Sequence, residues 1–260
     1  MRIIGITFFI VFSTLSCHAQ IVHKATPKAE MNLLDTIAST NPDYLLGKIN
    51  YADYPGSFTL IKPPYASSSM YLRIDAYQAF QSMADSAKKD GIQLRIISAA
   101  RNFDRQKSIW EAKWNGERLV EGKNLAKDVS EPAERARYIL LYSSMPGSSR
   151  HHWGTDIDIN SLEDAYFLSG KGKLEYQWLQ KNAPFFGFCQ PYTPKGIDRL
   201  TGYEEEKWHW TFMPVSSILT AEYARRITLS DIKGFKGDET ATDLDIIKNY
   251  VLGIAPQCKP

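Results

Sequence analysis

The sequence has 260 residues, of which 43% are hydrophobic and 23% are charged. This balance is typical of a globular protein and excludes a disordered chain, a collagen-like repeat and a multi-span membrane protein. The 31 Lys and Arg residues stand against 29 Asp and Glu residues, a formal net charge of +2 that predicts no broad basic surface for nucleic acid.

The first element in the chain has the pattern of a secretory signal peptide. A short positive start precedes a nearly continuous apolar run over residues 3–15, which is too short to span a bilayer, and small residues lead to an expected cleavage point after Ala19. Lipid attachment at Cys17 is the weaker alternative, because the residues before it stand in the wrong order for a lipoprotein signal. Loss of residues 1–19 would leave an exported protein, periplasmic or secreted, without a transmembrane segment.

The rest of the chain alternates helical and strand patterns. Apolar residues recur at helical spacing over residues 76–87, Gly91 can end that helix, and residues 92–97 alternate as a strand does. The later elements, in chain order, are expected to be a helix capped by Asn102 or Asp104, a helix opened by Ser130 with Pro132 just inside it, a strand over 155–159, a helix over 174–183, a strand over 208–212, and helices over 215–226 and 243–254.

This mixture of helices with few strands predicts a single α+β domain over residues 28–260. The helical patterns from about residue 215 form a C-terminal extension, which is expected to pack back onto the domain. No internal repeat interrupts the pattern, and no feature of the sequence specifies an oligomeric state.

Export places the two remaining cysteines in an oxidising compartment. Cys189 and Cys258 can then form a disulfide that ties the C-terminal tail to the main body. Two separate thiols are the alternative, because two isolated cysteines do not by themselves indicate a pair. Neither cysteine lies near a histidine or in a C-x-x-C motif, so any metal is expected to be held by His and carboxylate side chains.

One candidate metal-binding segment runs over residues 148–158. Asp156 and Asp158 share one face of the expected strand, because side chains alternate with period two. Gly154 allows a tight turn, so that His151 and Asp158 can converge on one point. A neutral imidazole and a carboxylate are ligands that a borderline cation such as Zn²⁺ accepts.

A second segment, residues 204–210, supplies a third histidine. His209 would complete a set of three protein ligands and leave the fourth tetrahedral position open, as in catalytic rather than structural zinc sites. Hydrolysis would then need a base, and Glu206 can serve, as can Glu204 or Glu205 on spacing alone. Either segment alone is more often a packed histidine or a solvated acidic turn. Together they favour a metal site.

These segments resemble the motifs of the VanY-like zinc D-alanyl-D-alanine carboxypeptidases. Residues 149–158, SRHHWGTDID, are similar to S-x-H-x-x-G-x-x-x-D, and residues 206–210, EKWHW, are similar to E-x-W-H. Upstream, residues 98–106, SAARNFDRQ, are similar to S-G-Y-R-S-x-x-x-Q. The three motifs occur in the family's order, and the resemblance covers about residues 30–215.

The resemblance implies a role for each matching residue. It implies that zinc is bound by His151, Asp158 and His209, that Glu206 rather than its two neighbours is the catalytic base, that Arg101 faces the scissile carbonyl or a terminal carboxylate, and that Gln106 and Ser149 bind substrate. His152 is expected to point away from the metal or to hydrogen-bond a ligand, with the alternative that it is itself the ligand.

The resemblance also implies a fold and a reaction. The fold is the α+β domain of the hedgehog and D-Ala-D-Ala peptidases, a small central antiparallel sheet with flanking helices. The reaction is removal of C-terminal D-alanine from peptidoglycan stem peptides. The alternatives are an L,D-carboxypeptidase acting on tetrapeptide stems and a non-catalytic wall-binding relative. The chain departs from the family at 99–100, 152–153 and 155–156, where Ala-Ala, His-Trp and Thr-Asp stand, the last in place of a frequent Leu-Ala. These departures leave the predicted metal ligands intact and bear on how substrate fits.

Overall fold

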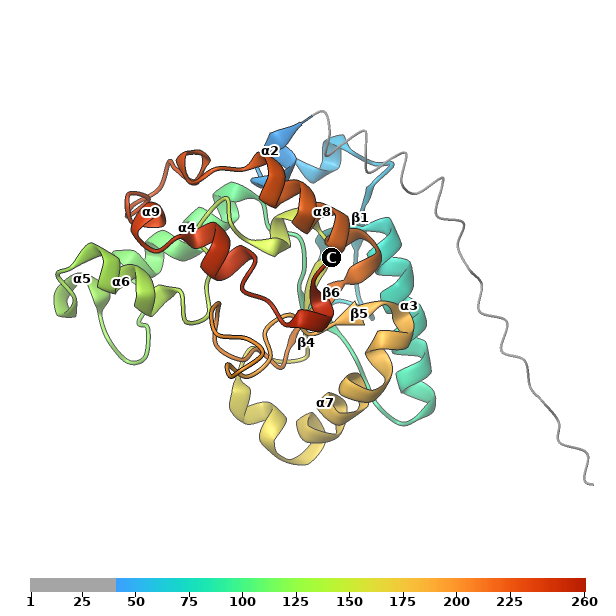
Figure 1. Cartoon of the computed structure of the whole chain (residues 1–260). Coiled ribbons are helices and arrows are strands. Elements are labelled where there is room, and N and C mark those ends of the chain that lie inside the picture. Colours follow the sequence, from blue (N-terminus) through green and yellow to red (C-terminus); the bar gives the residue numbers. More distant parts are fainter. Residues whose placement is uncertain (1–40) are drawn as a thin grey trace, which may run out of the picture.

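The computed structural model describes residues 41–260 (Figure 1). The predicted signal peptide, Cys17 and the expected start of the domain at residue 28 therefore lie outside the described residues. Among the helices of residues 41–260, none has the length and apolar character needed to cross a membrane.

A four-stranded sheet forms the centre of the structure. Its strands lie in the order β3-β4-β6-β5, and each neighbouring pair is antiparallel. The strands are β3 (Ile96–Ser98), β4 (Asp156–Ile159), β5 (Phe188–Cys189) and β6 (His209–Phe212). With helices on its flanks, this small antiparallel sheet confirms the predicted α+β fold class.

The alternation in β4 explains how one strand serves both the core and the site. Ile157 and Ile159 are fully buried and pack into the main hydrophobic cluster. Asp156 and Asp158 occupy the alternate positions, so their side chains project from the other face. The register pairs Asp158 with His209 and Asp156 with Thr211, which brings the predicted ligands of the two segments side by side.

The main helices are α3 (Ile74–Lys89), α4 (Phe103–Trp114), α6 (Pro132–Ile139), α7 (Gly170–Asn182) and α8 (Met213–Arg226). In the view of Figure 1, α3 lies to the right of the sheet, and α4, α5, α6 and α9 form a group to its left. The shorter elements are α2 (Pro42–Leu45), α5 (Leu125–Asp128), α9 (Thr240–Asp243) and a hairpin of β1 (Phe58–Ile61) with β2 (Met70–Arg73).

Two hydrophobic clusters correspond to this arrangement. One joins the sheet, the hairpin, α3 and α8, and the other joins α4 and α6 to the C-terminal residues. The predicted extension after residue 215 therefore packs into both clusters. Its α8 contributes Val215, Leu219 and Tyr223 to the first, and residues from 232 onward contribute to the second.

Several predicted boundaries shift by a few residues. β3 begins at Ile96 rather than at residue 92, and α7 begins at Gly170 rather than at residue 174. Asn102 is the cap of α4, because its side chain accepts a hydrogen bond from the backbone N–H of Arg105 at 3.0 Å. The cap of α6 is Glu131 rather than the predicted Ser130, since Pro132 is the first helical residue.

The continuous helix predicted over residues 243–254 is wrong. The chain instead forms the short α9 and then a π-helical turn, Ile247–Val251. Between them, Asp245 adopts a φ of +43°, in the left-handed region that interrupts a right-handed helix. Of the apolar residues that recur at helical spacing in this range, Leu244, Val251 and Ile254 are buried, and Ile247 and Tyr250 pack partly buried against the core.

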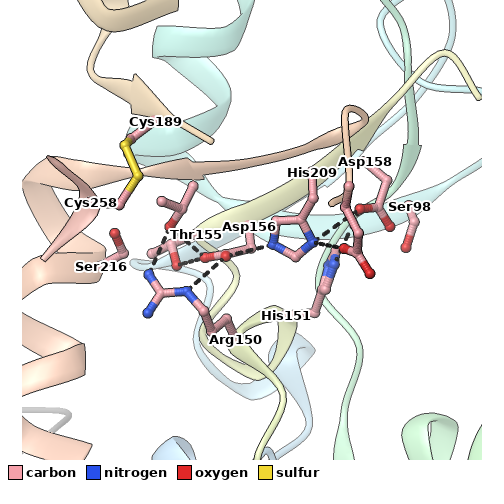
Figure 2. Close-up of polar contacts among 12 residues, drawn as sticks. Ser98, Arg150, His151, Thr155, Asp156, Asp158, Cys189, His209, Ser216 and Cys258 are labelled. Carbon is pink, nitrogen blue, oxygen red and sulfur yellow. Dashed lines mark hydrogen bonds and ion pairs between the residues drawn. A yellow bond between two sulfur atoms is a disulfide. The ribbon is translucent and has the colours of Figure 1, made fainter. Parts of the chain in front are cut away.

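A disulfide joins Cys189 on β5 to Cys258 near the C-terminus, with 5.8 Å between the two Cα atoms. This confirms the predicted pairing. The bond connects the edge of the sheet to the C-terminal segment (Figure 2).

Candidate metal centre

His151, Asp158 and His209 form a compact buried cluster. Each offers one ligand atom, and these atoms lie within 4.8 Å of one another. Oδ1 of Asp158 is 3.5 Å from Nε2 of His151 and 3.4 Å from Nδ1 of His209. His151 lies on a 3-10 turn, Arg150–Trp153, and the other two residues lie opposite each other on β4 and β6.

The turn before β4 depends on Gly154, as the sequence predicts. Its φ of +68° lies in the left-handed region that favours glycine. A Cβ at this position would lie 2.5 Å from Cε1 of Phe58, so no larger side chain fits without movement. The turn thereby directs His151 back toward Asp158.

Hydrogen bonds fix the ring nitrogen that each histidine presents to the cluster. Nδ1 of His151 lies 2.8 Å from the carbonyl oxygen of Ala99, which can only accept, so Nδ1 carries the proton and Nε2 faces Asp158. Nε2 of His209 lies 2.8 Å from Oδ2 of Asp156, so its Nδ1 faces the cluster. Both imidazoles therefore direct a ring nitrogen at Asp158.

The cluster fits a bound cation. Oδ1 of Asp158 is buried and has no hydrogen-bond partner among residues 41–260, which is costly for a carboxylate oxygen. A metal ion between this oxygen and the two ring nitrogens would satisfy it. Two imidazoles and one carboxylate are a donor set that Zn²⁺ accepts while keeping a further position open.

Glu206 is the acidic neighbour of this cluster. Its Oε2 lies 3.1 Å from Nδ1 of His209, and its side chain lines the same cleft. Glu204 and Glu205 instead contact lysines, Lys195 at 2.6 Å and Lys207 at 2.5 Å. Sequence spacing leaves these three carboxylates equivalent, but the side chains that they contact in the structure distinguish them.

Burial and hydrogen bonding act on the pKa values in different directions. Burial raises the pKa of Glu206, and the hydrogen bond from His209 works against that rise. Burial lowers the pKa of His151. Burial also acts to lower the pKa of His209, but hydrogen bonds to Asp156 and Glu206 outweigh it and raise that pKa to about 9.

Arg101 follows β3 and is held in a fixed position at the cluster. Its Nη1 donates to Oγ of Ser98 at 2.6 Å and lies 3.4 Å from Oδ2 of Asp158, and its Nε donates to Oε1 of Gln106 at 3.1 Å. Gln106 in turn donates to the carbonyl oxygen of Ser144 at 2.8 Å. Within the described part of the chain, Nη2 of Arg101 makes no hydrogen bond, so it is available to a ligand.

These groups line one cleft of about 430 Å³. Its lining includes the cluster residues, Glu206, Arg101 and Gln106, together with Lys113, Tyr142 and Trp208. Such a volume is sufficient for a short peptide segment.

Ser149, which was predicted to bind substrate, and His152, the alternative metal ligand, lie away from this cleft. Ser149 is 1% exposed and does not line the cleft, and its predicted contact with substrate stays a prediction. His152 accepts from the backbone N–H of Gly147 at 3.0 Å, so its Nδ1 donates to the carbonyl oxygen of Arg101 at 2.6 Å. As predicted, His152 points away from the cluster, and it anchors the backbone that carries Arg101.

Asp156 is a site residue for which sequence reasoning assigned no role. Its position on the same face as Asp158 was the available signal. In the structure it contacts His209 on the side of the ring opposite the cluster (Figure 2).

Comparison with known proteins gives a consistent family. The model of the VanY family, described as D-alanyl-D-alanine carboxypeptidase, matches residues 69–215, which contain every cluster residue as well as Arg101 and Glu206. The Bacillus subtilis protein YodJ is 32% identical over 197 residues, which are 69% of this chain and 63% of that protein. A D-alanyl-D-alanine carboxypeptidase of Enterococcus faecalis is 29% identical over 146 residues, which are 56% of this chain and 49% of that protein.

The chain thus spans about half to two thirds of the length of these two relatives. A solved structure of the LdcB LD-carboxypeptidase is also similar, with a TM-score of 0.47 and 25% identity, covering 74% of this chain and 87% of that one. Because the family model matches more than half of the sequence, this chain belongs to the VanY D-alanyl-D-alanine carboxypeptidase family.

Proposed function

We propose that this chain is a zinc-dependent carboxypeptidase that removes the C-terminal D-alanine from peptidoglycan stem peptides. One observation carries the proposal: a carboxylate oxygen of Asp158 that has no hydrogen-bond partner within residues 41–260 faces two imidazole nitrogens, with the carboxylate of Glu206 beside them in a cleft. Membership of the VanY family supports the class of reaction.

Zinc binding and proton transfer are assigned to different residues of the site. His151, Asp158 and His209 would hold zinc, which when bound supplies Lewis acidity that polarises a peptide carbonyl and makes a water molecule more acidic. Glu206 takes a proton from the attacking water at its carboxylate. As the C–N bond breaks, Glu206 returns that proton to the amine of the departing D-alanine, so it ends the reaction in its starting state.

Burial suits Glu206 to both steps. The buried site raises the pKa of Glu206, which makes the carboxylate a stronger base than one in water. The departing amine is a stronger base than this carboxylate, so it can take the proton from Glu206.

Arg101 is the residue that we expect to select a peptide end. A guanidinium pairs with a carboxylate through two parallel hydrogen bonds, and Nη2 of Arg101 makes no hydrogen bond within the described residues. Ser98 and Gln106 hold the rest of the group in place. Docking the terminal carboxylate on Arg101 would put the preceding peptide bond near the cluster.

We also propose that the protein acts outside the cytoplasm. The disulfide between Cys189 and Cys258 is of a kind that persists in oxidising compartments, and the proposed substrate lies in the cell wall. The predicted signal peptide agrees with this location.

The test is to incubate the zinc-loaded protein with pentapeptide and tetrapeptide wall fragments and to measure product masses. The proposal expects loss of one D-alanine from the pentapeptide. Trimming of the tetrapeptide alone would instead indicate an L,D-carboxypeptidase, internal cuts an endopeptidase, and intact peptides with a full equivalent of zinc a non-catalytic wall-binding protein.

The role of Glu206 is tested in the same assay. Glu206→Gln should keep one equivalent of zinc and lose about 10²- to 10⁴-fold in turnover, because the proton carrier is gone. Glu204→Gln is the matched control, since Glu204 pairs with Lys195 and should leave turnover unchanged. Equal turnover in the two variants would refute the assignment.

A further inference from the structure

A buried charged network lies behind the metal cluster. Oδ2 of Asp156 accepts from Nε2 of His209 at 2.8 Å and from Nε of Arg150 at 3.1 Å. Its Oδ1 accepts from the hydroxyls of Thr155 and Thr211, both at 2.7 Å (Figure 2). The carboxylate is fully buried, and both of its oxygens are hydrogen-bonded.

Arg150 is fixed as firmly as Asp156. Its Nη1 donates to Oγ1 of Thr220 at 2.8 Å and its Nη2 donates to Oγ1 of Thr211 at 3.0 Å. Its guanidinium carbon lies 4.7 Å from the centre of the Trp153 ring. Arg150 therefore compensates the buried charge of Asp156 and prevents its carboxylate from turning away from His209.

The contact acts on His209 in a defined way. When the ring is neutral, as a metal-binding imidazole must be, a carboxylate held in one orientation fixes the remaining proton on Nε2 and orients the ring, so that the lone pair of Nδ1 faces Asp158. A carboxylate partner also makes an imidazole a stronger electron donor to a metal. Neither effect needs Asp156 to touch the ion.

The network is a feature of this chain rather than of the motif it resembles. At positions 155 and 156 the chain has Thr-Asp where Leu-Ala is frequent. Alanine offers no acceptor to an imidazole. The substitution therefore adds the carboxylate and one of the hydroxyls that hold it.

We propose that Asp156 is a positioning residue for the metal site: it fixes the tautomer and orientation of His209 and thereby increases the affinity for zinc. The inference rests on the proposed zinc site but does not depend on which peptide is cleaved. Arg150, Thr155 and Thr211 hold Asp156 through hydrogen bonds, and Thr220 in turn holds Arg150.

The test is the zinc dissociation constant of wild type and variants, measured by competition with a chromophoric chelator. Asp156→Ala should weaken zinc binding about 10- to 100-fold. Asp156→Asn should recover part of this loss, because an amide oxygen can still accept from Nε2 of His209. The visible spectrum of the Co²⁺-loaded protein should change in Asp156→Ala and return toward wild type in Asp156→Asn.

A double variant separates this role from folding. Asp156→Ala alone leaves the Arg150 charge buried without a partner, whereas Arg150→Met with Asp156→Ala removes the ion pair as a unit. The double variant should fold and still bind zinc 10- to 100-fold more weakly. Thr155→Val is the matched control, since it removes one hydrogen bond to Oδ1 and leaves the contact with His209; its zinc affinity should stay within about threefold of wild type.

The outcomes are distinct. A folded double variant with wild-type zinc affinity would overturn the inference and leave the proposed function standing. A wild-type protein that binds no zinc would overturn both. Zinc affinity that falls equally in Thr155→Val and Asp156→Asn would mean that the network acts only through general stability, which also overturns the inference.

Discussion

Removal of the disulfide between Cys189 and Cys258 should cost a large share of the stability of the protein. The bond closes a loop whose ends are 69 residues apart in the sequence. In the chain-entropy model, a loop of about 70 residues restricts the unfolded chain by about 15 cal/mol/K, or about 4 kcal/mol at 25 °C. Since domains unfold with about 5–15 kcal/mol, this is enough to change the stability of the protein markedly.

The assay is urea unfolding of the oxidised protein, of the reduced wild type and of the Cys189→Ser/Cys258→Ser double variant. The reduced wild type carries no new hydroxyl at the buried position 258, so it isolates the effect of the bond itself. Both reduced and double-variant proteins should lose about 4 kcal/mol, with the variant slightly less stable because a serine hydroxyl is buried. A loss below about 1 kcal/mol in the reduced wild type would refute the reasoning from loop length.

The metal cluster should survive this change in the folded state. His209 and Asp158 are placed by the pairing of β6 with β4, whereas the disulfide joins the edge strand β5 to the C-terminal segment. Zinc affinity of the reduced protein, measured well below its unfolding transition, should therefore stay near that of the oxidised protein. Loss of zinc binding without unfolding would show that the tail, and not the sheet, holds the ligands in place.

Two further changes test the electrostatics and the backbone. Burial lowers the pKa of Lys113 to about 8, and its Nζ donates to Ser143, so the folded chain loses this proton before the unfolded chain does. The free energy of unfolding should then rise between about pH 8 and 10.5. Lys113→Met should flatten that rise and increase the free energy of unfolding by up to about 3 kcal/mol at pH 7. Urea titrations across this pH range would measure both effects. Gly154→Ala should cost about 3 kcal/mol, because its φ is positive and its Cβ would meet Phe58. Gly91→Ala, also at positive φ but with open space around it, should cost only about 1 kcal/mol in the same thermal unfolding measurement.

The convergence of two of the three cluster residues was predictable because its determinants are local. His151 and Asp158 are separated by a glycine turn and a strand of period two, and these features are visible in a single stretch of sequence. Glu206 was different. Spacing left Glu204, Glu205 and Glu206 equivalent. In the structure, Glu204 and Glu205 contact lysines, whereas Glu206 contacts His209. Only the resemblance to a family motif anticipated that distinction.

The C-terminal region shows that the spacing of apolar residues does not determine whether a helix is continuous. Of the apolar residues that recur at helical spacing there, Leu244, Val251 and Ile254 are buried, whereas Ile247 and Tyr250 are only partly buried. The spacing does not specify one continuous helix, because a chain with a left-handed residue at Asp245 can bury the same positions through two short turns. Periodicity therefore predicted burial, while the backbone conformation of one residue decided the continuity of the helix.

Asp156 and Asp158 of β4 have different roles, and the alternation of side chains along the strand does not explain the difference. Both project from the same face, but Asp158 lies opposite His209 whereas Asp156 lies opposite Thr211. At Asp156, Arg150 approaches from the preceding turn, and both carboxylate oxygens accept hydrogen bonds from protein groups. At Asp158, one carboxylate oxygen has no hydrogen-bond partner within residues 41–260. The cross-strand neighbour thus determines which carboxylate is available to a metal ion and which one orients its ligand.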